Sequence, residues 1–87
     1  MFSLMPAIQQ LIPGQRYRVI RAFTDYDGGQ HPVGETWVFE RTNFVPYHDG
    51  LTLHVSMHGG PQVYRLQWLP EEQGALIENF TDFVVAC

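Results

Sequence analysis

Apolar and polar residues alternate most regularly over residues 51–58. Four apolar residues occupy every second position, and they are Leu51, Leu53, Val55 and Met57. Because successive side chains of a strand point to opposite faces of a sheet, this pattern predicts a strand with one buried face. We expect Gly59-Gly60 to form the tight turn of a hairpin. Pairing outward from that turn matches the apolar faces, with Val55 opposite Tyr64, Leu53 opposite Leu66 and Leu51 opposite Trp68.

A second pair of β-rich runs lies nearer the N-terminus. The runs span residues 17–24 and 33–42, and residues 25–32 join them. This connection is rich in aspartate, glycine and proline, which favour turns for separate physical reasons. The pattern therefore predicts a first hairpin, in whose turn Asp25 and Asp27 bond to local backbone amides.

Short helices are predicted near both ends of the chain. In the first, bounded by Pro6 and Pro13-Gly14, the apolar residues near one side are Met5, Ile8, Leu11 and Ile12. The second begins at Leu69-Pro70-Glu71-Glu72, where proline and two carboxylates suit a first turn, and runs to about Phe80. We expect its buried face to contain Leu76, Ile77 and Phe80, and residues 81–86 to form a short closing strand.

These elements predict a mainly β fold with one or two short helices. About five strands would form a small barrel or a strongly bent antiparallel sheet. At 87 residues the chain is long enough for one hydrophobic core, so we expect a single domain over residues 1–87, with the N-terminal segment 1–14 packed on it.

The charge of the chain narrows the classes of function. The formal net charge is −4, and the sequence contains no lysine, so all five basic residues are arginine. A lysine nucleophile is excluded, and the chain lacks the basic field on which nucleic-acid binding depends. We therefore expect no nucleic-acid partner. A small anion-binding patch at Arg16, Arg18 and Arg21 remains an alternative.

The cysteine content and the N-terminal segment indicate in which cellular compartment the protein is expected. Cys87 is the single cysteine, so neither an intrachain disulfide nor a multi-cysteine zinc site can form. Residues 1–14 contain no basic leader and only short apolar runs, which fits neither a secretory signal nor a membrane span. We expect a cytoplasmic protein that does not bind a membrane.

The histidines are candidate metal ligands or catalytic groups. His54 and His58 share a strand face, but four residues of strand separate them by about 13 Å, which is too far for joint ligation of one ion. No nucleophile elbow surrounds either serine. We therefore expect no metal, no cofactor and no catalytic residue.

Aromatic and acidic residues outside the second hairpin suggest a binding surface. Tyrosine and tryptophan offer large contact areas, and nearby carboxylates could orient a basic or proline-rich ligand. The candidate ligand-binding residues are Asp25, Tyr26, Asp27, Glu35, Trp37 and Tyr47. The alternative for Trp37, which shares a strand face with Phe39, is a place in the core, and this alternative is favoured.

Part of this region resembles a known family. Ala22-Phe23-Thr24-Asp25-Tyr26 and Gly34-Glu35 are similar to two segments of SH3 domains, over about a quarter of the chain. The resemblance implies a small SH3-like β-barrel that binds proline-rich peptides, with Tyr26 in an aromatic groove and Asp25 or Asp27 on its acidic rim. The paired tryptophans and the late proline-serine-asparagine-tyrosine segment of that family are absent. The whole chain is also similar to small bacterial domains of this size, a resemblance that implies no biochemical role.

Two functions follow as hypotheses. The first is a non-enzymatic interaction domain that binds a protein segment or a second copy of itself through the aromatic and acidic surface. The second is a small hydrolase or metal-dependent enzyme that uses His48, His54 or His58 with Asp49.

Overall fold

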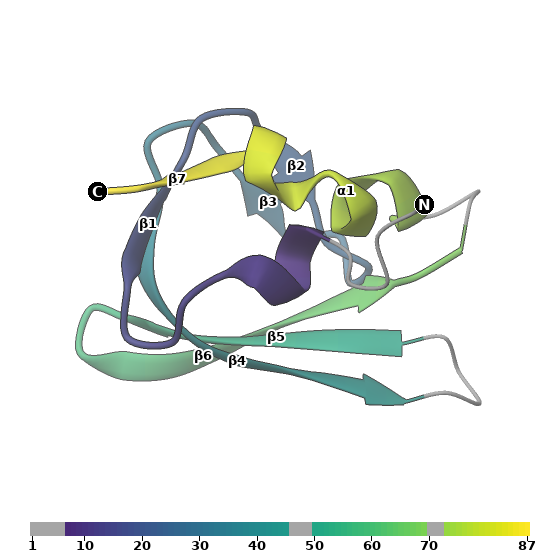
Figure 1. The fold of residues 1–87 in the computed structure, drawn as a ribbon, viewed down its shortest axis with the longest axis horizontal. Coiled ribbons are helices and arrows are strands. Elements are labelled where there is room, and N and C mark those ends of the chain that lie inside the picture. Colours follow the sequence, from purple (N-terminus) through teal and green to yellow (C-terminus); the bar gives the residue numbers. More distant parts are fainter. Residues whose placement is uncertain (1–6, 46–49, 70–72) are drawn as a thin grey trace.

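The computed structural model describes residues 7–45, 50–69 and 73–87, and its strands form two antiparallel sheets (Figure 1). The larger sheet has the order β6-β5-β4-β1-β7, and the smaller one pairs β2 with β3. In chain order the elements are η1 (Ala7–Gln10), β1 (Arg16–Val19), β2 (Phe23–Thr24), β3 (Gln30–His31), β4 (Thr36–Val45), β5 (Gly50–Met57), β6 (Gly60–Gln67), α1 (Gly74–Glu78), η3 (Phe80–Asp82) and β7 (Val84–Ala86).

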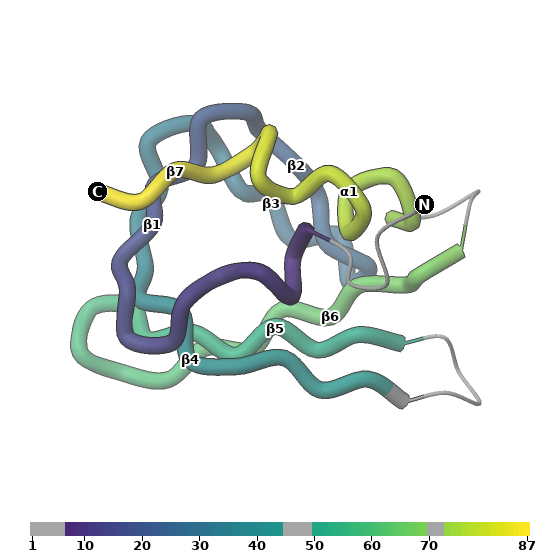
Figure 2. The backbone as a smooth tube through the Cα atoms, in the orientation of Figure 1, coloured from purple at the N-terminus to yellow at the C-terminus, as the bar shows by residue number. Residues whose placement is uncertain are grey.

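The larger sheet is strongly bent and does not close into a barrel. In Figure 1, β4, β5 and β6 form the lower layer, β1 rises at the left, and β7 crosses above. The backbone trace shows the same course, with the 3-10 helix η1 lying between the lower layer and β7 (Figure 2). The edge strands β6 and β7 do not pair with each other. The mainly β fold is therefore confirmed in its bent-sheet form, and the SH3-like barrel is not.

The core lies on the concave side of this sheet. Its largest fully buried side chains are Trp37, Phe80, Ile8, Leu51, Leu53, Leu66, Ile77, Val19 and Val55. They come from η1, β1, β4, β5, β6, α1 and η3, so each short helix buries its apolar residues against the sheet. Burial of these side chains is the main source of stability, at about 1.5 to 3 kcal/mol for each large aliphatic or aromatic group.

The first predicted hairpin is present, but it is divided into two ladders. Tyr17 pairs with Trp37 in β1 and β4, and Phe23 pairs with His31 in β2 and β3. From the first pair to the second, one strand advances by as many residues as the other recedes. The register is therefore the same in both ladders. Between the ladders, the Gly34 amide donates to the carbonyl of Val19, and Gly34 has a φ of 98° that favours glycine.

The second hairpin has the predicted faces but a different register. Leu53 pairs with Tyr64 and Leu51 with Leu66, two residues away from the predicted partners. The turn residues are His58 and Gly59, both with positive φ, rather than Gly59 and Gly60. The predicted turn was wrong because it would place Pro61 in the first hydrogen-bonded pair, where proline has no N–H to donate. A shift of two residues keeps every side chain on its face, so the buried pattern was still correct.

The two terminal predictions are confirmed in part. Ile8 and Leu11 are buried, whereas Ile12 is 63% exposed, and Met5 lies outside the described residues. At the other end, α1 is shorter than predicted, and Pro70, Glu71 and Glu72 also lie outside the described residues. The closing strand begins only at Val84, because residues 80–82 form η3.

One glycine in the second helix region allows a close approach of two backbone segments. A Cβ atom on Gly74 would lie 2.7 Å from the carbonyl oxygen of Leu69, so a close backbone approach requires glycine there. The buried face contains Leu76, Ile77 and Phe80, as predicted.

Within the described ranges, no helix is long and apolar enough to span a membrane.

Candidate functional site

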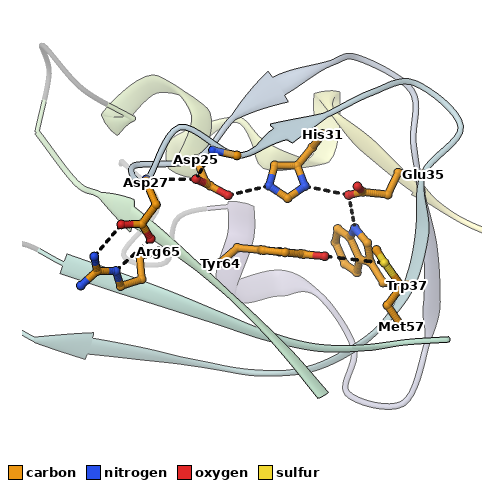
Figure 3. A network of polar contacts seen from close by, with 9 residues as sticks. Asp25, Asp27, His31, Glu35, Trp37, Met57, Tyr64 and Arg65 are labelled. Carbon is orange, nitrogen blue, oxygen red and sulfur yellow. Dashed lines mark hydrogen bonds and ion pairs between the residues drawn. The ribbon is translucent and has the colours of Figure 1, made fainter. Parts of the chain in front are cut away.

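A buried histidine links two carboxylates inside the first hairpin (Figure 3). His31 Nε2 lies 2.8 Å from Asp25 Oδ2, and His31 Nδ1 lies 2.7 Å from Glu35 Oε1. The indole Nε1 of Trp37 donates to the same Glu35 oxygen at 3.1 Å. The side chain of His31 is 4% exposed and that of Asp25 8%. We call Asp25, His31, Glu35 and Trp37 the His31 network.

The His31 network needs two protons for its two short contacts. A carboxylate oxygen only accepts, and a neutral imidazole carries one N–H. Both contacts are hydrogen bonds either when the ring is an imidazolium between two carboxylates or when one carboxyl group holds the second proton. In both arrangements the three ionisable groups together carry one negative charge, which is held in the interior by hydrogen bonds.

Two aromatic rings pack against the imidazole of His31. Phe23 stacks on the ring at 4.6 Å between centroids, and Tyr64 contacts it edge to face at 4.3 Å. Burial, with Glu35 and Asp25 nearby, raises the pKa of Tyr64 to about 12. Its hydroxyl donates to Met57 Sδ at 3.9 Å. The 4% exposed imidazole therefore lies in the interior, where its hydrogen bonds to Asp25 and Glu35 join the two sides of the first hairpin.

Asp25 connects the His31 network to the turn that follows β2. Its Oδ1 accepts hydrogen bonds from the amides of Asp27 at 3.0 Å and Gly29 at 2.8 Å. The Asp25 amide in turn donates to the Gly29 carbonyl. This local bonding is the turn-stabilising role predicted for Asp25. The same carboxylate therefore fixes the loop backbone with one oxygen and His31 with the other.

The outer end of this turn lies against strand β6. Arg65 donates from Nε to Asp27 Oδ2 at 3.0 Å, and its Nη2 donates to Oδ1, which makes a two-point ion pair. The Tyr26 amide donates to the Arg65 carbonyl at 2.8 Å. The guanidinium of Arg65 lowers the pKa of Asp27. These contacts hold the tip of the first hairpin on the edge of the main sheet.

A hollow of about 420 Å³ lies beside this contact. We call it the Tyr26 pocket, and its lining residues are Tyr26, Gly50, Leu51, Thr52, Arg65, Leu66 and Gln67. Tyr26 is 50% exposed, although its backbone is hydrogen bonded to the sheet. The pocket therefore combines a fixed aromatic residue with polar side chains of β5 and β6.

Comparison with known proteins places the chain in a family. Residues 7–83 match the model described as domain of unknown function (DUF3601). The chain belongs to this DUF3601 family. No curated protein matches it.

A solved structure shares the fold of this DUF3601 chain. It is an integron cassette protein from the mobile metagenome of Vibrio cholerae, 31% identical, with a TM-score of 0.86. The match covers 88% of this chain and 86% of the cassette protein. The resemblance to small bacterial domains is thereby supported, whereas the SH3 resemblance is not confirmed.

The structure separates the six predicted ligand-binding residues of this DUF3601 chain. Tyr26 and Asp27 are exposed at the hairpin tip, and Tyr47 lies outside the described residues. Asp25 and Glu35 face His31, and Trp37 is 1% exposed. For Trp37 the core alternative is confirmed. The acidic rim expected around Tyr26 is reduced to Asp27, whose charge Arg65 neutralises.

Three important residues were missed by the sequence reasoning. The sequence pattern placed His31 in a connection and Tyr64 opposite Val55, and it assigned no role to Arg65. His31 had a recognisable signal, because continuing the first hairpin in one register places it directly opposite Phe23. Arg65 had no recognisable signal in the sequence, because its contact with Asp27 joins residues 38 positions apart.

Two residues of the histidine alternative, His54 and His58, lie in the described part of the chain. His48 and Asp49 lie outside the described residues. His54 Nε2 lies 2.9 Å from Asn43 Nδ2, and burial, followed by the charge of Arg41, lowers the pKa of His54. Among the residues that the structure describes, no three histidine, cysteine, aspartate or glutamate side chains gather as metal ligands would.

Proposed function

We propose that this DUF3601 chain is a non-enzymatic binding domain that holds an extended protein segment in the Tyr26 pocket. The observation that carries the proposal is a half-exposed tyrosine on a fixed loop beside a hollow of about 420 Å³. That volume is within the usual range for ligand pockets, about 300 to 1,000 Å³.

Rigidity of the loop supports a binding role for Tyr26. The Tyr26 amide donates to the Arg65 carbonyl, the Asp25 carboxylate accepts hydrogen bonds from two later amides of the same loop, and His31 contacts the other oxygen of Asp25. A ring presented by a fixed backbone loses little conformational freedom when a ligand packs on it. Tyrosine also offers an apolar face and a polar hydroxyl within one side chain.

Charge at the pocket favours main-chain carbonyl groups as the polar part of the ligand. Arg65 has five N–H groups, and its two-point contact with Asp27 occupies only two of them. Because Asp27 neutralises the guanidinium, the remaining donors suit neutral acceptors such as peptide carbonyls rather than free anions. A proline-containing segment fits this chemistry, since proline supplies a carbonyl and an apolar ring without a backbone donor.

Two-dimensional NMR with a library of extended peptides tests the proposal. We expect a subset, rich in proline, to shift the amides of Tyr26, Arg65 and Gln67. Tyr26→Ala and Arg65→Gln should each weaken binding by at least about fivefold, which corresponds to about 1 kcal/mol. Arg18→Gln is the matched control, because it makes the same chemical change at an exposed position of β1.

Two outcomes of these experiments would contradict the proposal. Peptide binding that is unchanged in Tyr26→Ala and Arg65→Gln, or that is lost equally in Arg18→Gln, refutes the Tyr26 pocket as the site. If no peptide shifts these amides and the protein stays monomeric, the interaction function itself is wrong.

A further inference from the structure

The outer face of β4 and β5 contains a second polar hollow that is separate from the Tyr26 pocket. It has a volume of about 310 Å³, and its lining includes Glu40, Arg41, His54, Ser56, Gly59 and Val63. We call it the His54 pocket. The concave face of the sheet packs on the core, whereas this hollow opens on the opposite face.

The His54 pocket lies at an irregularity in β4. The pairing register between β4 and β5 shifts between Phe39 and Arg41, which is a β-bulge. Phe39 pairs with Val55 on the core face, and Arg41 then pairs with His54 on the outer face. A bulge changes the direction of side chains on its strand, and here it places a guanidinium directly across from an imidazole.

The polar groups of the His54 pocket are mainly hydrogen-bond donors. The Asn43 amide nitrogen can only donate, so His54 Nε2 accepts from it at 2.9 Å, and the neutral ring carries its proton on Nδ1. Ser56 lies two residues along the same face of β5 and offers a hydroxyl. Among the described residues, Arg41 forms no ion pair.

We propose that the His54 pocket binds a tetrahedral oxyanion, such as a phosphate group, between Arg41, His54 and Ser56. Arginine matches the geometry of phosphate oxygens and provides the positive charge. The His54 Nδ1–H and the Ser56 hydroxyl supply two further donors. The net charge of −4 opposes general anion binding, so an anion held here is held by these local groups.

The pKa of His54 should report whether an anion is bound, because the ring lies among charged groups. Arg41 on β4 and burial both lower the pKa of His54, while Glu40 is the carboxylate that lines the same pocket. The pocket residues contributed by β6, Pro61, Gln62 and Val63, do not titrate. An anion beside the ring favours the imidazolium, so anion binding and His54 protonation should strengthen each other.

NMR titration of the histidine rings with sulfate tests this site, because sulfate keeps its charge throughout the pH range used. We expect saturating sulfate to raise the pKa of His54 by about half a pH unit or more, equivalent to about threefold tighter binding to the protonated ring. Sodium chloride at equal ionic strength is the control for screening and should not reproduce the shift.

Three variants separate a specific site from a general salt effect. Arg41→Gln should weaken sulfate binding at least about tenfold, and without sulfate it should raise the pKa of His54, since a neighbouring cation is removed. Glu40→Gln should strengthen sulfate binding because it removes the opposing carboxylate. Arg18→Gln on β1 should leave the pKa of His54, and the shift that sulfate causes in it, unchanged.

The proposal is overturned if Arg41→Gln binds sulfate as the original chain does, or if chloride produces the same shift of His54. It is also overturned if sulfate binds without changing the titration of His54. None of these results bears on peptide binding at the Tyr26 pocket, which is tested by Tyr26→Ala and Arg65→Gln.

Discussion

Replacing His31 with leucine should destabilise the domain severely while leaving a side chain of similar size in the core. The change removes two hydrogen bonds to carboxylates, those to Asp25 at 2.8 Å and Glu35 at 2.7 Å. Hydrogen bonds to charged groups contribute about 1.5 to 3 kcal/mol each, and a buried charge that loses its partner costs about 3 to 5 kcal/mol.

The expected loss of stability is reduced by the hydrogen bonds that the two carboxylates keep. Asp25 keeps two backbone donors, and Glu35 keeps the Trp37 indole and is 17% exposed. We therefore expect a loss of about 3 kcal/mol, from a total stability of about 4 to 13 kcal/mol for a domain of this length. Because each kcal/mol shifts the melting temperature of such a domain by about 4 to 8 °C, the fall should be about 12 to 24 °C.

A second substitution makes the test specific for the buried charge. Asp25→Asn should destabilise the original chain by roughly 1 kcal/mol, because it weakens the contact with His31. In the His31→Leu background the same change should be neutral or stabilising, since it removes a carboxylate that has lost its partner. Urea denaturation followed by tryptophan fluorescence measures all four free energies of unfolding. Additive effects of the two changes, or a His31→Leu loss below about 1 kcal/mol, would refute the structural role of the network.

Three further predictions concern the turn, the buried tyrosine and the second helix. Gly59→Ala should cost about 1 to 2 kcal/mol in urea denaturation because Gly59 has a φ of 78°. Gly60→Ala should cost far less, because Gly60 has no positive φ and its Cβ would meet only the Met57 carbonyl oxygen, at an ordinary contact distance of 3.9 Å. Equal losses would contradict the His58-Gly59 turn. Tyrosinate absorbance should contain a component that ionises near pH 12 and disappears in Tyr64→Phe. Since the folded pKa of Tyr64 lies above the value in the unfolded chain, its contribution to stability is complete below about pH 10 and is lost as the pH rises toward 12; a Tyr64→Phe variant with the same alkaline loss of stability would contradict this reasoning. Gly74→Ala should destabilise the domain although alanine favours helices by about 1 kcal/mol, because the new Cβ would meet the Leu69 carbonyl at 2.7 Å; a higher melting temperature would show that this backbone contact relaxes at little cost.

The sequence by itself determined the buried faces of the second hairpin and the absence of a lysine nucleophile. Alternation over Leu51, Leu53 and Val55 is a local property, because the side-chain period of a strand is two whatever its partner is. The buried face of the last helix could likewise be predicted from Leu76, Ile77 and Phe80. Pro61 contained enough information to place the second turn correctly, since a proline cannot donate in the closing pair of a hairpin.

Tertiary structure alone decided which polar residues meet. Aspartates in a turn-forming segment look the same in sequence whether they point to solvent or inward. In the folded chain the register of β2 and β3 directs Asp25 toward His31, whereas Asp27 contacts Arg65 on β6. The β-bulge that pairs Arg41 with His54 left no recognisable pattern in the chain either. Local propensities act between near neighbours, whereas these contacts depend on how the bent sheet brings distant strands together.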